Sequence, residues 1–130
     1  MLRHDAFDAW MTAYGAAWLS NDAADVAALF GRDATYSVGP FAQPWTGRTQ
    51  IVEEWTSDPL GQRDIEFAHD VLAVDGDVGV ARWRVAYTTA ADGRRFEMDG
   101  VLVARFAPGG ADAGRCVAHE EWYDRRELSP

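Results

Sequence analysis

The stretch from Val71 to Phe106 limits the folds open to this chain more than any other, because it reads as strands joined by tight turns. In order, it contains a strand over Val71–Val74, a turn over Asp75–Asp77, a strand over Val78–Thr89, a turn over Ala90–Gly93 and a strand over Arg95–Phe106. Both turns contain an Asp-Gly pair. Such pairs between β-branched and aromatic runs are strong hairpin signals, because glycine tolerates positive φ. The sequence therefore predicts an antiparallel sheet.

The middle strand of this stretch alternates in polarity. Trp83, Val85 and Tyr87 fall on one face, and Arg82 and Arg84 fall on the other. The alternation indicates that one face of the sheet is covered and that the other is wet or shared with a partner. The helices that can cover the apolar face all precede the sheet.

Three helices are predicted in the first half of the chain. Phe7, Trp10, Met11, Tyr14 and Trp18 recur at spacings of three and four, the pattern of one buried helix face. The other expected elements are a second helix over about 23–30 capped by Gly31, a strand over 34–38, a loop over 39–45, a third helix from about 46–49 that ends at 58–61, strands over 65–71 and 115–123, and a charged tail over 124–130.

This order of elements indicates an α+β fold, because helices gathered on one face of an antiparallel sheet make the sheet curl around them. A curled sheet closed by a helix at one end forms a cone, and such cones often hold a pocket. The length of 130 residues suits a single domain over residues 1–130.

Composition argues against several classes of function. A net charge of -9 and a pI near 4.6 speak against nucleic acid and anionic membranes as partners, because both need a basic surface. The single cysteine, Cys116, cannot form an internal disulfide, which favours a cytoplasmic location. No apolar run is long enough for a membrane span. The three histidines lack metal-ligand spacing, so neither a metal nor a cofactor is expected.

Seven segments carry a family resemblance that covers about residues 5–126. They are AAWLSND at 16–22, VAALFGRDATY at 26–36, GRTQI at 47–51, VDGD at 74–77, ARW at 81–83, DGVLVARF at 99–106 and HEEWY at 119–123. Together they resemble the nuclear transport factor 2-like superfamily, whose fold is a cystatin-like cone. Within it they are most similar to the SnoaL-like, or polyketide cyclase-like, group.

The resemblance implies a curved antiparallel sheet wrapped around three N-terminal helices, with one or two acid/base groups in an apolar cone. It also implies a homodimer through the outer sheet face, where the apolar Val101 and Val103 are expected. Ketosteroid isomerase is one of the enzymes with this fold. Tyr14 falls where that isomerase has a tyrosine, whereas Val38 stands where its general base lies. Steroid-type isomerisation is therefore not expected.

Four further residues join Tyr14 as candidates for acid–base chemistry. His69 shares a strand face with Phe67 and can be a base in the cone or a strand histidine satisfied by a neighbour. His119 and Glu121 share a face of the last strand. They can act on a ligand together, or they can take part in a cross-strand ion pair with Arg82, Arg84 or Arg105. A one-residue slip would exchange them for Glu120 and Trp122.

Asp99 is the fifth candidate. In an apolar cone its carboxyl group would have a raised pKa and could donate a proton. The isomerase resemblance places an oxyanion-binding aspartic acid near Asp99, with Leu102 as the alternative counterpart. The plainer interpretation of Asp99 is a strand-edge residue near Arg94 or Arg95. The epoxide hydrolases of this fold place Arg and two Asp on facing strands, and Arg84, Asp99 and Glu121 provide similar types.

Six tryptophans in 130 residues exceed the usual need of a core this size, so some aromatic side chains are expected to line a pocket. Phe41 and Trp45 lie on the loop over 39–45 and are candidates for a lid. The predicted ligand-binding residues are Trp18, Phe41, Trp45, Trp55, Phe67, Trp83 and Tyr87.

Two hypotheses follow. In the first, the chain is a cofactor-free enzyme that moves protons in an isomerisation, cyclisation or hydration of a small apolar or polyketide-like molecule. In the second, it is a non-catalytic ligand-binding or dimerisation module of the same fold. The missing base at Val38 favours the second hypothesis, and the pair of His119 and Glu121 favours the first.

Overall fold

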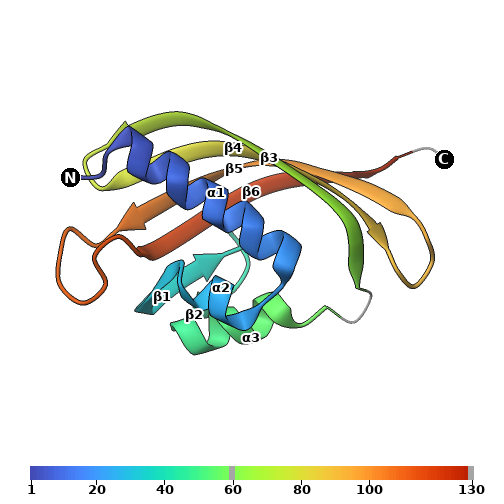
Figure 1. Ribbon diagram of the computed structural model, residues 1–130, viewed down its shortest axis with the longest axis horizontal. Helices are drawn as coiled ribbons and strands as arrows, with labels where there is room; N and C mark the ends of the chain where they lie inside the picture. Colours follow the sequence, from blue (N-terminus) through green and yellow to red (C-terminus); the bar gives the residue numbers. More distant parts are fainter. Residues whose placement is uncertain (59–60, 129–130) are drawn as a thin grey trace.

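A curved six-stranded sheet and three helices make up the computed structural model (Figure 1), which describes residues 1–58 and 61–128. The elements, in chain order, are α1 (His4–Ser20), α2 (Ala23–Ala27), β1 (Phe30–Ser37), β2 (Trp45–Thr46), α3 (Arg48–Thr56), β3 (Gln62–Asp75), β4 (Val78–Thr89), β5 (Arg95–Phe106) and β6 (Cys116–Glu127). None of the helices in the described ranges is long and apolar enough to cross a membrane.

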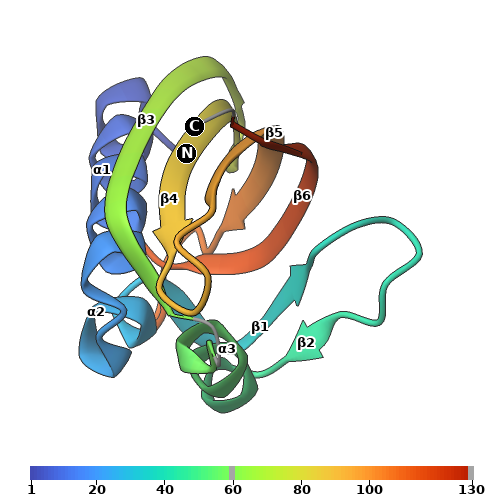
Figure 2. The same cartoon turned by 90° about the vertical axis from the view of Figure 1, so that its right-hand side faces the viewer.

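The sheet has the strand order β2-β1-β6-β5-β4-β3. Strands β3 to β6 form an antiparallel series, and the sheet that they form curls around α1 (Figure 2). The pairing of β1 with β6 is parallel, which the sequence did not predict. The architecture is the α+β cone that the sequence indicated.

Both predicted hairpins are present, and β4 and β5 have the predicted bounds. Gly76 and Gly93 adopt φ of 60° and 70° in the two turns, which explains the Asp-Gly signal. Trp83 is fully buried, whereas Arg82 and Arg84 are exposed. The predicted alternation of β4 is therefore confirmed.

Several predicted boundaries differ from the structure. The strand predicted over 34–38 begins at Phe30, and the strands predicted over 65–71 and 71–74 form one strand, β3. The second helix ends at Ala27 rather than at Phe30, because Phe30 already belongs to β1 and faces Cys116 of β6 in the parallel ladder. The backbone carbonyl of Leu29 accepts a hydrogen bond from the Cys116 amide at 2.9 Å. Gly31 therefore lies in a strand and does not cap the helix. The third helix ends at Thr56, and residues 59–60 of its predicted stop signal lie outside the described residues.

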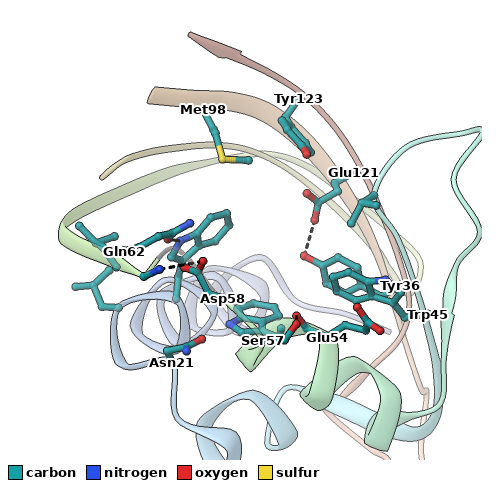
Figure 3. Close-up of a pocket in the computed structure, with 16 residues that line it drawn as sticks. Asn21, Tyr36, Trp45, Glu54, Ser57, Asp58, Gln62, Met98, Glu121 and Tyr123 are labelled. Carbon is teal, nitrogen blue, oxygen red and sulfur yellow. Dashed lines mark hydrogen bonds between the residues drawn. The ribbon is translucent and has the colours of Figure 1, made fainter. Parts of the chain in front are cut away.

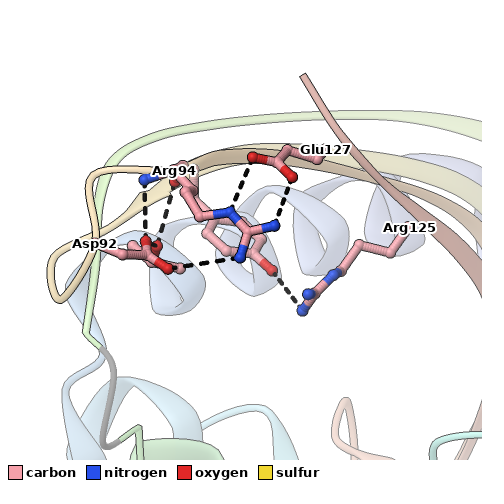
Figure 4. A network of polar contacts seen from close by, with 6 residues as sticks. Asp92, Arg94, Arg125 and Glu127 are labelled. Carbon is pink, nitrogen blue, oxygen red and sulfur yellow. Dashed lines mark hydrogen bonds and ion pairs between the residues drawn. The ribbon is translucent and has the colours of Figure 1, made fainter. Parts of the chain in front are cut away.

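The predicted charged tail over 124–130 is also wrong for its first part, because β6 continues to Glu127. Residues 124–127 pair with the start of β5, and Glu127 lies opposite Phe96. The guanidinium of Arg94 donates two hydrogen bonds to the Glu127 carboxylate, at 2.6 and 2.9 Å, and lies near Asp92 (Figure 4). Backbone pairing and this bidentate ion pair together extend the strand.

Gly15 of α1 packs closely against Phe67 of β3. A Cβ atom built on Gly15 would lie 2.5 Å from Cδ1 of Phe67, whose ring is held between Tyr14 and Trp18. Overpacking of this kind costs about 1–3 kcal/mol. The better helix propensity of alanine recovers at most about 1 kcal/mol.

Gly15→Ala is therefore expected to lower the free energy of unfolding by about 1–2 kcal/mol, measured by urea denaturation. Gly109→Ala is the matched control, because a Cβ there meets no atom within 4 Å. A Gly15→Ala protein as stable as the wild type would show that helix and sheet can separate without cost.

Candidate functional site

A pocket of about 450 Å³ opens between the end of α1, helix α3 and the inner face of the sheet (Figure 3). This volume lies in the range typical of small-molecule sites. The residues that line it are Trp18, Leu19, Asn21, Tyr36, Val38, Trp45, Glu54, Trp55, Ser57, Asp58, Gly61, Gln62, Ile65, Met98, Glu121 and Tyr123. Aromatic rings form much of the wall, and exposed polar residues of α3 and the segment after it lie at the mouth.

Glu121 is a buried carboxylate of this wall, with 4% of its surface exposed. Its Oε1 atom lies 2.5 Å from the hydroxyl of Tyr36, 3.0 Å from Nε2 of His119 and 3.5 Å from the hydroxyl of Tyr14. The hydroxyl groups of Tyr14 and Tyr36 are 2.8 Å apart. We call these four residues the Glu121 cluster.

The geometry assigns the protons of the cluster when Glu121 is ionised. The Tyr36 hydroxyl donates to Oε1, so its oxygen accepts the proton of Tyr14. Nε2–H of His119 also donates to Oε1. The imidazole of His119 is stacked between the rings of Tyr36 and Tyr14, at 4.0 and 5.6 Å, which fixes its orientation. Its Nδ1 is buried and has no hydrogen-bond partner among the described residues, as suits a neutral ring with no proton on that atom.

The second carboxylate oxygen of Glu121, Oε2, has no hydrogen-bond donor in the part of the chain that the structure describes. Figure 3 shows the carboxyl group pointing from β6 into the pocket. One oxygen is thus held by the protein and the other is open to a ligand. A carboxyl group held in this way can take a proton from a bound molecule or give one to it.

The two buried tyrosines of the cluster predict a loss of stability at alkaline pH. Burial, aided by the charge of Glu121, raises the pKa of Tyr14 and Tyr36 well above the ordinary value of 10. Burial also raises the pKa of the Cys116 thiol to about 12. The folded protein therefore keeps protons that the unfolded chain releases. These groups leave stability unchanged at neutral pH and lower it as the pH rises above about 9, by up to about 1.4 kcal/mol per pH unit for each group.

Urea denaturation over a pH series checks this slope, and phenolate absorbance checks its cause. Tyr36→Phe should reduce the slope, because it removes one of the titrating groups. Titration of Tyr14 and Tyr36 near pH 10 in the folded protein would contradict the assignment.

The structure brings three of the five predicted acid–base residues together, namely Tyr14, His119 and Glu121. It also settles the facing of the last strand. His119 and Glu121 are buried, whereas Glu120 and Trp122 point outward.

His69 does not reach the pocket. Its Nε2 lies 2.7 Å from the carboxylate of Asp8 on α1, and its neighbour Phe67 packs on the same helix at Gly15. His69 therefore joins β3 to α1, as a strand histidine satisfied by a neighbour.

Asp99 lies on the outer face of the sheet, outside the apolar cone. Arg82 donates two hydrogen bonds to its carboxylate, at 3.0 and 2.6 Å. These bonds and the positive charge of Arg82 hold the pKa of Asp99 below its usual value, opposite to the raised pKa expected of an acid in the cone. Arg84 lies opposite Asp99 on this outer face, whereas Glu121 lies on the inner face. The three residues therefore do not form one site.

Trp18, Trp45 and Trp55 line the pocket, as predicted for ligand-binding residues. The other four lie elsewhere. Phe41 is fully exposed, and Phe67, on β3, packs against Gly15 of α1. Trp83 is buried beside Trp18, and Tyr87 is buried beside Phe96.

Tyr36 is the main site residue that the sequence analysis did not select. Its side chain alternates with Ala34 and Val38 along the first strand, so the alternation could have placed it on the same face as Val38. Gln62, Met98 and Tyr123 are further lining residues. Gln62 accepts a hydrogen bond from the Trp18 indole at 2.9 Å, a pairing 44 residues apart in sequence that has no local signal.

No group of three or more histidine, cysteine, aspartate or glutamate side chains in residues 1–58 and 61–128 is arranged to hold a metal ion. The fold and pocket define a cone-shaped α+β protein with a buried carboxylate facing a small-molecule-sized cavity. Residues 11–119 match the SnoaL-like domain family. The chain therefore belongs to this family, within the nuclear transport factor 2-like superfamily.

Solved structures share the fold at low sequence identity. TsrD from Streptomyces laurentii is 18% identical, with a TM-score of 0.75 over 95% of this chain and 92% of TsrD. A type 2 hexachlorocyclohexane dehydrochlorinase, LinA, is 8% identical, with a TM-score of 0.78 over 96% of this chain and 88% of LinA. A hypothetical protein from Catenulispora acidiphila DSM 44928, with a ketosteroid isomerase-like fold and in complex with trimethylamine, is 18% identical, with a TM-score of 0.71 over 88% and 84% of the two chains. No curated protein sequence matches the chain.

Proposed function

We propose that this SnoaL-like protein binds a small, mainly apolar molecule in the pocket and moves a proton on it through Glu121, without a cofactor. The observation that carries the proposal is the buried carboxylate with one oxygen held by Tyr36 and His119 and the other open to an aromatic-walled pocket. The reaction class is an isomerisation, cyclisation or elimination that begins with removal of a proton. The LinA neighbour, a dehydrochlorinase, shows that this fold supports eliminations.

In this mechanism Oε2 of Glu121 takes a proton from the bound molecule and returns it to another atom of that molecule or releases it to water. Tyr36, Tyr14 and His119 act as positioning residues, because they hold Oε1 and fix the direction of Oε2. Tyr14 does not line the pocket, and the Tyr36 hydroxyl donates its only proton to Oε1, so neither tyrosine is proposed as a direct donor to an oxyanion.

Hydrogen–deuterium exchange tests the reaction class before the substrate is known. A panel of small cyclic ketones and diketones is incubated with the protein in deuterium oxide, and loss of the proton next to the carbonyl is followed by NMR. The proposal predicts exchange that depends on Glu121 for at least one member of the panel. Exchange at the buffer rate for every member, although some bind in the pocket, would favour the non-catalytic binding module.

The second candidate function, a non-catalytic binding module, rests on Val38. This apolar residue of the pocket wall stands where the resemblance to ketosteroid isomerase would place the base. A cytoplasmic location, a single domain over 1–130 and independence from cofactors stay predictions from the sequence.

We also propose a homodimer through the outer sheet face. Val80 lies opposite Val103, and Val101 lies opposite Trp122, so four apolar side chains adjoin on this face. Trp122 is 42% exposed in the single chain. Large exposed aromatic residues are enriched at such interfaces.

Trp122→Glu is expected to convert the dimer to a monomer, because it buries a charge in the interface, and sedimentation equilibrium measures the change. Phe41→Glu is the control, since Phe41 is fully exposed on the loop between β1 and β2 and not on β4, β5 or β6. A wild-type monomer at high concentration would contradict the proposal.

A further inference from the structure

We infer that the pocket selects a positively charged organic ligand, a substituted ammonium ion with an apolar body. This inference rests on the proposed use of the pocket as a ligand site, but not on catalysis by Glu121. Three carboxylate residues, Glu54, Asp58 and Glu121, line the cavity, and no lysine, arginine or histidine does so in the described part of the chain. Such a wall favours a cation and disfavours an anion.

Among the described residues, no arginine forms an ion pair with the Glu121 carboxylate, and its neighbour in salt-bridge geometry is the imidazole of His119 at 3.0 Å. Only 4% of the Glu121 side chain is exposed, and its hydrogen-bond partners are two phenols and an imidazole. A doubly protonated His119 would bury an unpaired Nδ1–H, so the imidazole does not provide the missing charge. A buried carboxylate without a cationic partner is costly, and a ligand ammonium beside Oε2 would neutralise it.

The aromatic walls also suit a cation. Trp45 stacks on Tyr36 at 4.8 Å, and the ring of Trp55 stands nearly perpendicular to that of Tyr36, at 78°. Trp18 meets Trp55 at 69°. Rings set at steep angles present faces on several sides of one space, the arrangement that recognises ammonium groups through cation–π attraction.

Arg82 and Arg125 do not alter this charge balance. Arg82 is bound to Asp99 on the outer face. Arg125 belongs to the inner face of β6, but its guanidinium lies 4.3 Å from the Phe96 ring centroid and donates to the Tyr87 hydroxyl at 3.4 Å. Neither residue lines the cavity.

Three probes of nearly equal shape and different charge test the inference. They are choline, its neutral carbon isostere 3,3-dimethylbutan-1-ol and the anion 3,3-dimethylbutanoate. Binding is followed through the indole N–H resonances of Trp18, Trp45 and Trp55 by NMR titration. Choline is expected to bind at least about tenfold more tightly than the neutral alcohol, because it gains cation–π contacts with the tryptophan rings and an ionic contact with Glu121. The anion is expected not to bind.

Matched variants locate the preference. Glu121→Gln should reduce the preference for choline over the alcohol by about tenfold or more and leave binding of the alcohol nearly unchanged. Glu120→Gln removes the same charge from the outward side of β6 and should have no effect. Trp45→Leu should weaken choline, whereas Trp122→Leu, on the outer face, should not.

Equal or tighter binding of the alcohol or the anion would overturn the inference, and so would a preference for choline that Glu121→Gln leaves unchanged. If charge preference is absent while Glu121-dependent exchange of ketone protons persists, the inference fails and the proposed function stands. If no probe perturbs the pocket tryptophans and no exchange occurs, both fail.

Discussion

Glu121→Gln is expected to lower the rate at which the protein exchanges ligand protons by about 10²–10⁴-fold, while the protein stays folded and at least as stable as the wild type. Glutamine keeps the size of the side chain, and its amide oxygen can still accept from Tyr36 and His119. It cannot take a proton at neutral pH. The change also removes a carboxylate that is 4% exposed and has no arginine partner among the described residues, so stability should be unchanged or higher by about 1 kcal/mol.

This pairing of lost activity with retained stability separates a functional carboxylate from a structural one. Exchange rates and urea midpoints are measured for Glu121→Gln and for Glu120→Gln, whose side chain points to solvent on the same strand. A loss of more than about 2 kcal/mol in Glu121→Gln would mean that the cluster serves the fold, because buried polar groups of structural networks cost that much to disturb.

Phe7→Ala is expected to lower the free energy of unfolding by about 3–5 kcal/mol, the usual range for a fully buried phenylalanine. Phe7 has no exposed surface, meets Phe106 edge-on at 5.9 Å and lies so close to β4 that a Cβ on Gly79 would be 2.6 Å from its ring. Truncation would leave a cavity where α1 is fastened to the sheet, far from the pocket mouth.

Phe41→Ala makes the same chemical change at a fully exposed side chain and should alter the free energy of unfolding by less than about 0.5 kcal/mol. Phe7→Leu keeps much of the packing and should fall between the two, which keeps the comparison measurable if Phe7→Ala does not fold. Equal effects at Phe7 and Phe41 would contradict the assignment of the core.

The parts of the fold that were predictable from sequence are those with local signals. The Asp-Gly turns and strict alternation marked β4 and β5, and the spacing of Phe7, Trp10 and Tyr14 marked α1. The parallel pairing of β1 with β6 joins residues about 80 positions apart and has no local pattern. The extension of β6 to Glu127 escaped prediction because charged residues read as a tail until their partner, Arg94, is seen.

The candidate site was predictable to the same extent. Alternation placed His119 and Glu121 on one strand face, and the family resemblance pointed to Tyr14. Periodicity could not tell which side of the sheet Asp99 faces, because the strand on which it lies has apolar residues at both parities near Gly100. His69 has the predicted facing, but that part of the inner face is covered by α1 rather than by the pocket.

The most direct test of the account is a crystal structure of the protein with choline or a co-purified ligand. Ligand density is expected between the rings of Trp18, Trp45 and Trp55, with a ligand atom in contact with Oε2 of Glu121. A cavity closed by the protein's own side chains, with Oε2 bonded to one of them, would contradict it.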